Sequence, residues 1–474
     1  ISFKTPVRFK QFVVFLKRDI LKKISDSQYL IINFLEAPLL AFLLSFIVKY
    51  YNVGVSNKYG YTLLENSNLP VYIFMSVIVA IFMGLTVSAE EIIKDRKILK
   101  REAFLNLSWS GYLLSKVAVQ FILSAIQALT FVLVGNSIME IKDMYLEYWI
   151  VLFSAWASSN LMGLLISDSF KTVVTIYILI PFLVIPQIIL SGIIVKYEKL
   201  NPTISSPSKI PFYGEIITAR WAYEGLATYQ FIENDYEQNF YDSEKVMSIA
   251  NYKSNFLLKD LQNKLSFVSS NLGNETASEK ISYNLNLIRN ELREELESRL
   301  IMENYYENVP GYGHKYLDQL TLDKIDKEVI KYTNDYLKAL TASFSKIYKE
   351  AYEKTNDIKQ SFELEKLQNI RRQHFNESLE ELVTNKNEFD RIVEYDGQLI
   401  QKTDPIFHDP TSRLIKAHFY APQKMFFGTY IPTIWANVIV IWFMTIALYI
   451  LLYYRVLKRV LDFFEDLSIR QKRP

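Results

Sequence analysis

The sequence contains no cysteine and only four histidines among its 474 residues. Disulfides and thiolate metal sites are therefore excluded, so packing has to stabilise any soluble part. The histidines lack the short spacing of a metal-binding motif, and we expect surface positions and no metal site for His314, His374, His408 and His418. The 53 basic and 51 acidic residues nearly balance, so no charge excess predicts a nucleic-acid partner.

Signs of catalysis are also missing. The sequence has no G-x-x-x-x-G-K-[ST] segment, whose backbone N–H groups would hold the phosphates of ATP. The insert described below shows no catalytic constellation either. We therefore expect no catalytic residue, no cofactor and no enzyme activity in this chain.

Long apolar runs are abundant, and they gather toward the two ends of the chain. Hydrophobic residues make up 50% of the sequence and charged residues 22%, with the charges concentrated in the middle and at the junctions. A hydrocarbon core about 30 Å thick needs roughly 20 apolar residues in a helix. Six predicted transmembrane helices satisfy this, at residues 29–51, 70–89, 112–138, 147–166, 171–195 and 431–454.

Basic residues fix the expected orientation of these spans. They cluster before the first span (4–23), after the second (94–101) and after the sixth (455–473). The positive-inside rule makes all three clusters cytoplasmic. Both termini then lie inside, and the long segment between spans five and six lies outside the cytoplasmic (inner) membrane, in the periplasm.

The first two dozen residues alternate apolar and basic positions at helical spacing. Phe9, Phe12, Leu16 and Ile20 form the apolar stripe, which predicts an amphipathic connecting helix along the inner membrane surface. An ordinary solvated entry segment is the alternative. Between spans five and six, apolar residues recur every three to four positions from about 241 to 395, which predicts an antiparallel helical bundle or stalk.

The predicted fold is thus an all-α membrane protein with a helical extracytoplasmic insert. Its parts are a cytoplasmic connecting helix (1–28), spans one to five with a coupling helix and a re-entrant segment (29–232), the insert (233–412), and span six with a cytoplasmic tail (413–474).

Three motifs carry a family resemblance. The stretch DRKILKRE at 95–102 leads into LSWSGYLLSK at 107–116; LSGIIV stands at 190–195; and PFY at 211–213 precedes RWAYEGL at 220–226. In this order they resemble the membrane half of ABC transporters of the G (white, pleiotropic drug resistance) subfamily. The insert is not covered by the resemblance, and the family's paired extracellular cysteines are absent, which favours a bacterial relative.

The resemblance implies roles for particular residues. Coupling to ATP would use Arg18, Glu90, Arg96, Arg101 and Glu102, with Arg18 facing Glu90 in a polar relay. A simple positive-inside anchor is the alternative for the charged helix. The substrate cavity would be lined by Val79, Ala80, Met83, Phe182 and Gln187, and the outward gate formed by Ile193 and Ile194 below a bend near Pro186. Lipid contact or helix packing explains each lining residue equally well.

The resemblance also implies a function and partners. A permease half of this kind forms a homodimer in membrane lipid and exports an amphipathic or lipid-like substrate. ATP and Mg²⁺ would bind a nucleotide-binding domain that precedes the spans or is a separate subunit, in agreement with a sequence that begins at Ile1. Two alternatives remain open: mechanical transmission to a periplasmic protein partner through the insert, without translocation, and a scaffold without ATP coupling.

Overall fold

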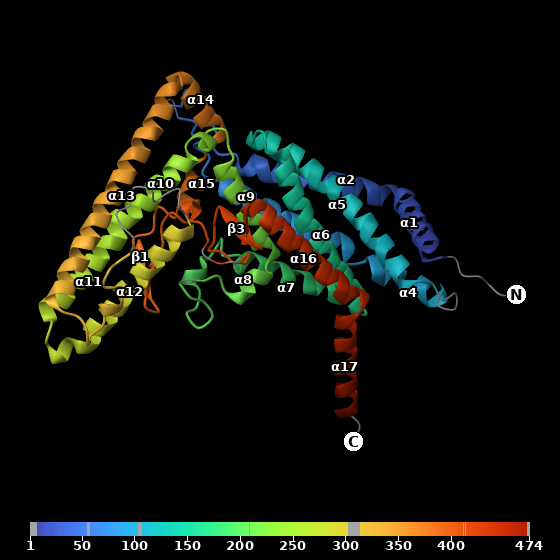
Figure 1. Cartoon of the computed structure of the whole chain (residues 1–474). Coiled ribbons are helices and arrows are strands. Elements are labelled where there is room, and N and C mark those ends of the chain that lie inside the picture. Colours follow the sequence, from blue (N-terminus) through green and yellow to red (C-terminus); the bar gives the residue numbers. More distant parts are fainter. Residues whose placement is uncertain are drawn as a thin grey trace.

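A computed structural model of the protein describes residues 7–54, 57–102, 107–207, 209–301, 313–410, 412 and 414–471. Long apolar helices form one body and a helical insert projects from it (Figure 1). Helices α1 (Arg8–Ile24), α4 (Glu91–Glu102) and α17 (Val456–Gln471) lie at the end of the body away from the insert.

Five helices are long and apolar enough to cross a bilayer, so the chain is a multi-pass membrane protein. They correspond to predicted spans one to four and six, and they are α2 (Ser27–Val48), α3 (Leu69–Ser88), α5 (Trp109–Met139), α6 (Tyr145–Ser169) and α16 (Thr433–Tyr453).

The predicted fifth span differs from its helix. Helix α7 (Val173–Ile189) has 17 residues and continues through Pro181 and Pro186. It ends where Leu190 donates its N–H to the Pro186 carbonyl, and Gly192 then adopts a left-handed φ of 80°. The C-terminal end of the predicted range 171–195 is therefore wrong. A long bent helix was expected there, but α7 ends at Ile189.

Helix α6 forms the centre of the body. Its apolar window is 83% buried, against 28% for α2 and for α16. Small residues allow close approach: a side chain at Gly84 of α3 would meet the Trp156 carbonyl oxygen of α6 at 2.6 Å. Close backbone contacts at small residues are typical of helices packed in membranes, where no hydrophobic driving force acts between the helices.

Two helices follow α7 and return into the body. Helix α8 (Phe212–Ile216) is one short turn, and α9 (Thr218–Ile232) is buried along nearly its whole length. Helix α9 packs against α3, α6 and α16, so the segment read as re-entrant lies within the bundle.

The insert has its own hydrophobic core, built from residues such as Leu261, Leu285 and Leu337. Its helices are α10 (Tyr241–Tyr252), a π-helical turn (Lys253–Leu257), α11 (Leu258–Asn271), α12 (Ser278–Ile301) and the 35-residue α13 (Lys327–Ser361). Short 3₁₀ turns lie in this part of the chain at Glu237–Asn239, Glu275–Ala277, Leu317–Gln319 and Pro405–Phe407. Another lies before the insert, between α7 and α8, at Tyr197–Lys199.

The base of the insert joins the membrane body. Helices α14 (Leu364–His374) and α15 (Glu377–Val383) bring Phe375, Leu379 and Val383 into the same core as the spans. Between them, Asn376 donates hydrogen bonds to the carbonyls of Leu63 at 2.7 Å and Asn66 at 2.8 Å. The insert is therefore fixed to the body at this point.

Two antiparallel hairpins depart from the all-α expectation. Strands β1 (Ile392–Tyr395) and β2 (Gln398–Gln401) flank Asp396 and Gly397, both with positive φ, as an Asp-Gly hairpin turn requires. Strands β3 (Gln423–Phe426) and β4 (Thr429–Pro432) form the second hairpin, directly before α16.

Candidate coupling site and adjoining cavity

A buried cluster of charges joins α1, α4 and α5. The Lys116 ammonium of α5 is 2.6 Å from Asp19 Oδ1 of α1, 3.1 Å from Glu91 Oε2 of α4 and 2.9 Å from Asp95 Oδ2 of α4. The Lys116 side chain is 3% exposed. Three buried carboxylates around one ammonium leave uncompensated negative charge, so further cations are needed nearby.

Helix α1 supplies those cations. Lys23 lies 2.5 Å from Glu91 and donates to the Tyr29 hydroxyl at 2.8 Å, while Lys22 lies 3.1 Å from Asp95. Burial alone would lower the pKa of Lys23, but Glu91 outweighs this and raises it, so Lys23 stays charged. With Asp19 and Lys116 included, three ammoniums balance three carboxylates.

Helix α4 is also locked to α6. The Ser167 hydroxyl accepts the N–H groups of Ile92 and Ile93 at 3.0 Å, which satisfies donors left free in the first turn of α4. In return Arg96 donates to the Ser167 and Asp168 carbonyls at 2.9 and 2.7 Å, at the end of α6. A displacement of α4 would therefore be transmitted to α1, α5 and α6.

The predicted coupling residues take different places. Arg96 belongs to this arrangement. Glu90 pairs with Lys94 and accepts the Tyr177 hydroxyl of α7 at 2.6 Å, and the Arg18 guanidinium lies 5.1 Å from the Phe15 ring centroid. Arg101 is exposed, and the side chain of Glu102 lies outside the described residues.

Sequence reasoning missed the residues that join α1 to α4 and α5. One signal was available: Lys116 stands inside predicted span 112–138, and a charge within an apolar run is costly unless it is paired. Asp19 was a second signal, as an acid in an otherwise basic stretch.

The predicted cavity residues divide into two groups. Ala80 and Met83 are buried in the core of the body, Val79 is half-buried, and Gln187 accepts the Ala219 N–H of α9 at 3.0 Å. Phe182 is 70% exposed on α7. Their role as cavity lining stays a prediction.

The predicted gate residues follow the end of α7. Ile193 is half-buried and Ile194 is 63% exposed. A Cβ at Gly192 would lie 2.4 Å from the Tyr197 ring, and the Tyr197 hydroxyl donates to the Leu190 carbonyl at 3.0 Å. This tyrosine holds the backbone before the two isoleucines, whose gating role stays a prediction.

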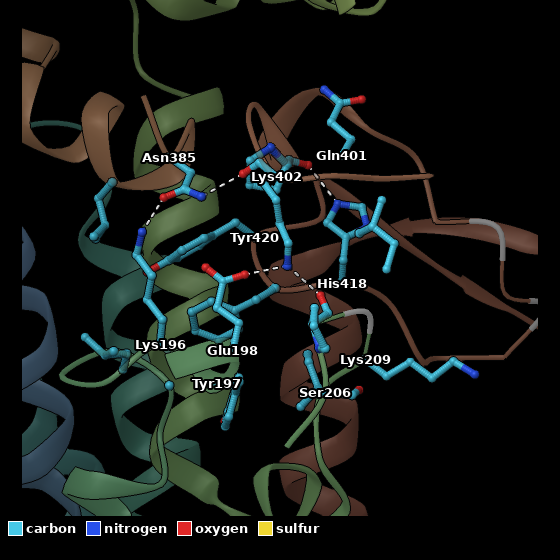
Figure 2. A pocket seen from close by; sticks show the side chains of 18 residues that line it. Lys196, Tyr197, Glu198, Ser206, Lys209, Asn385, Gln401, Lys402, His418 and Tyr420 are labelled. Carbon is cyan, nitrogen blue, oxygen red and sulfur yellow. Dashed lines mark hydrogen bonds and ion pairs between the residues drawn. The ribbon is translucent and has the colours of Figure 1, made fainter. Parts of the chain in front are cut away.

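A cavity of about 200 Å³ opens beside Gly192 and Ile193 (Figure 2). Its polar wall is a chain of contacts: Lys196 bonds to Asn385 Oδ1, and Asn385 donates to the Lys402 carbonyl at 2.6 Å. The Lys402 ammonium in turn contacts Glu198 at 2.5 Å and the Pro207 carbonyl at 2.6 Å. The remaining wall includes Ile193, Ile210, Ile400 and Phe419. The cavity is therefore amphipathic, between the chain after α7 and the base of the insert.

A second charge network is buried where α9 meets α16. Lys424 of β3 contacts Glu224 of α9 at 2.6 Å and Asn437 of α16 at 2.9 Å, and Arg220 lies 2.9 Å from Glu215. Burial lowers the pKa of Lys424 to about 8, since Glu224 offsets only part of the cost. The network fixes α9 to the hairpin before α16.

Comparison with known proteins agrees with this geometry. Residues 10–231, which carry the α1–α4–α5 cluster and the end of α7, match the ABC-2 type transporter family. A stretch of 197 residues, 39% of this chain, is 27% identical to an ABC transporter ATP-binding/permease protein of Mycobacterium tuberculosis (strain ATCC 25618 / H37Rv). The match covers 22% of that relative, so the chain spans about a fifth of its length. Residues 10–231 of this multi-pass protein are therefore similar to the membrane domain of ABC-2 type transporters.

Proposed function

We propose that this chain is the permease half of an ATP-driven exporter that works as a homodimer in the cytoplasmic membrane. The observation that carries the proposal is the buried cluster around Lys116, within the segment that matches ABC-2 type transporters. A nucleotide-binding domain that displaces α4 would move α1 and α5 with it, because separating buried ion pairs costs several kcal/mol. Arg101, exposed on α4, is available for contact with that domain.

The surface of α7 supports pairing with a second copy. One face of the helix is buried in the protomer through Ile176, Ile180, Val184 and Gln187. The opposite face is exposed at three-to-four-residue spacing, at Val174, Ile178, Phe182, Ile185 and Ile189. An apolar stripe along the exposed face of α7 suits a helix that meets its symmetry mate along a shared pathway.

The cavity beside Gly192 supports an amphipathic, lipid-like substrate. Its apolar wall would hold a hydrocarbon portion. The ammoniums of Lys196, Lys209 and Lys402 outnumber the Glu198 carboxylate in the wall and would attract an anionic head group. A substrate that passes the two isoleucines would meet this cavity next, so we infer outward movement.

The test is reconstitution of the protein with its ATP-binding domain in proteoliposomes. We expect ATP-dependent transfer of a head-group-labelled anionic phospholipid between leaflets. Lys116→Met should abolish transfer and leave ATP hydrolysis, whereas Lys17→Met, at an exposed lysine of α1 outside the buried cluster, should keep both. ATP hydrolysis by the wild type without transfer of any amphipathic probe would refute the exporter.

One observation favours a second candidate function, mechanical transmission to a periplasmic protein. Helix α13 spans the insert and connects through α14 to α15, whose Leu379 and Val383 lie in the core of the membrane body. Movement of the spans would therefore tilt the insert. Paired spin labels on α13 and α6 that change separation with ATP, in a protein that moves no lipid, would support this alternative.

A further inference from the structure

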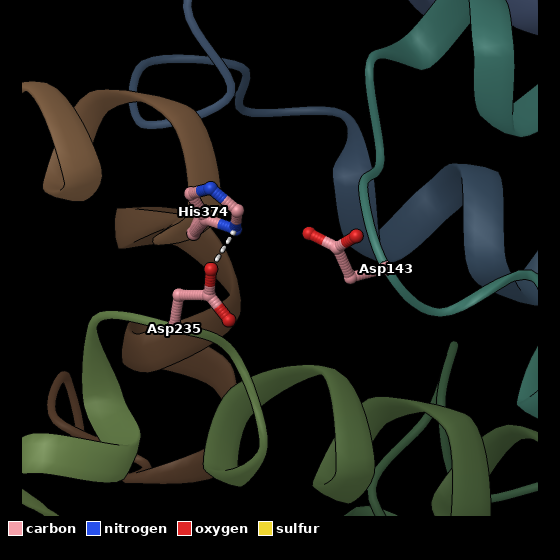
Figure 3. A group of neighbouring side chains, drawn as sticks. All are labelled: Asp143, Asp235 and His374. Carbon is pink, nitrogen blue, oxygen red and sulfur yellow. Dashed lines mark ion pairs between the residues drawn. The ribbon is translucent and has the colours of Figure 1, made fainter.

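Three potential metal ligands from distant parts of the chain meet at the base of the insert (Figure 3). Asp143 lies in the turn between α5 and α6, Asp235 follows α9, and His374 is the last residue of α14. One ligand atom from each side chain lies within 4.8 Å of the other two.

The backbone holds each ligand in place through a buried neighbour. Met144, Asn234 and Phe375, adjacent to the three ligands, are 4%, 2% and 4% exposed. Asn234 also accepts the N–H groups of Tyr236 and Glu237, at 3.1 and 2.9 Å, which fixes the loop that carries Asp235. The backbone positions of the three ligands are therefore fixed, while the side chains of Asp143 and Asp235 are exposed and free to turn toward an ion.

The spacing suits a shared cation better than a direct bond. His374 Nδ1 lies 3.7 Å from Asp235 Oδ2, which is too long for a hydrogen bond. Ligands bound at about 2.0–2.2 Å around a tetrahedral zinc ion stand roughly 3.3–3.6 Å apart, so a small side-chain rotation suffices. The cavity they line measures about 10 Å³, close to the volume of one water-sized probe.

The surrounding charges leave the site acidic. Glu233 and Lys142 line the same cavity, and the Lys142 ammonium donates to Gln373 at 2.8 Å. Lys142 opposes cation binding, but three carboxylates outnumber it. One imidazole with carboxylates is a donor set used by zinc and by other first-row divalent metals.

We propose that Asp143, Asp235 and His374 bind one divalent first-row cation, Zn²⁺ foremost, with water completing its coordination. The ion would tie the end of α14 to the α5–α6 turn and to the end of α9. It would thereby hold the insert in one orientation on the membrane body. This structural role goes beyond the proposed export.

Zinc binding to the purified full chain in detergent, stripped with EDTA, tests the proposal by isothermal titration. We expect one Zn²⁺ per chain and at least about tenfold weaker binding in His374→Ala and in Asp143→Ala. Asp390→Ala, at an exposed carboxylate outside the cluster, is the matched control and should bind as the wild type does. Unchanged affinity in His374→Ala would overturn the site, as would no zinc bound by the wild type at micromolar concentration.

A second measurement separates ligation from loss of folding. The chain has no cysteine, so Asp143→Cys introduces a unique thiolate. With Co²⁺ this variant should show a thiolate-to-cobalt charge-transfer band, and the band should disappear when His374→Ala is added while hydrogen-exchange protection of α5 and α6 is kept. A folded Asp143→Cys protein without the band would refute ligation at this position.

Discussion

Replacing Lys116 by methionine should weaken the attachment of α1 to the membrane body. Methionine keeps much of the length of the side chain but removes the charge that contacts Asp19, Glu91 and Asp95. Asp19 loses the ammonium 2.6 Å from its Oδ1, and its Oδ2 is already buried without a hydrogen-bond partner. Breaking a buried pair by removing one partner costs about 3–5 kcal/mol.

Hydrogen exchange followed by mass spectrometry measures this cost locally. At about 1.4 kcal/mol for each factor of ten, the amides of α1 should lose roughly a hundredfold or more of their protection in Lys116→Met. Lys22→Met removes a cation whose side chain is 57% exposed, and at about 0–1 kcal/mol it should change protection less than tenfold. Adding Asp19→Asn to Lys116→Met should restore part of the loss, since one uncompensated carboxylate is removed.

Equal protection of α1 in Lys116→Met and Lys22→Met would refute the reasoning. The buried cluster would then add nothing to the attachment of α1, and contacts such as that of Gln11 with the Ser108 N–H at 2.7 Å would hold the helix instead.

Three further predictions concern the insert and the chain after α7. Burial raises the pKa of Glu291 to about 7, so its protonated form stabilises the fold below pH 4.5 and that contribution is lost as pH rises through 7. Glu291→Gln keeps an acceptor for the Leu399 N–H and should stabilise the insert at pH 8, by roughly 3 kcal/mol at most, with no gain at pH 4, as measured by hydrogen exchange of α12. Gly192→Ala should cost about 1–3 kcal/mol in chemical unfolding, through its positive φ and the Tyr197 ring, and more than Gly273→Ala, which has positive φ but open space. Ile194→Cys should form a disulfide between two copies in at least one nucleotide state, and its absence in every state, checked on non-reducing gels, would remove Ile194 from the gate.

The membrane helices could be predicted because a bilayer demands them. An unbroken apolar run of about 20 residues has few alternatives once backbone groups must be satisfied within the segment. Helix α7 could not be placed as well, because its end depends on Tyr197 packing against Gly192, a contact that no local pattern encodes. The two hairpins were missed where four-residue strands gave too short an alternation to read, although Asp396-Gly397 was a usable turn signal.

Among the site residues, the charged helix at 91–102 was recognisable from its composition, and its place against α1 was expected. The sequence by itself determined which segments are apolar or charged, because solvent preference is a property of each residue and its near neighbours. Only the tertiary structure decided which charges meet. The histidines were expected at the surface, which is wrong for the buried His314, whereas His408 and His418 are half-buried. His374 meets Asp143 and Asp235 across separations that sequence spacing cannot show. Ion pairs such as Asp19 with Lys116 form at short range between residues far apart in the chain, so packing of the helices selects the partners.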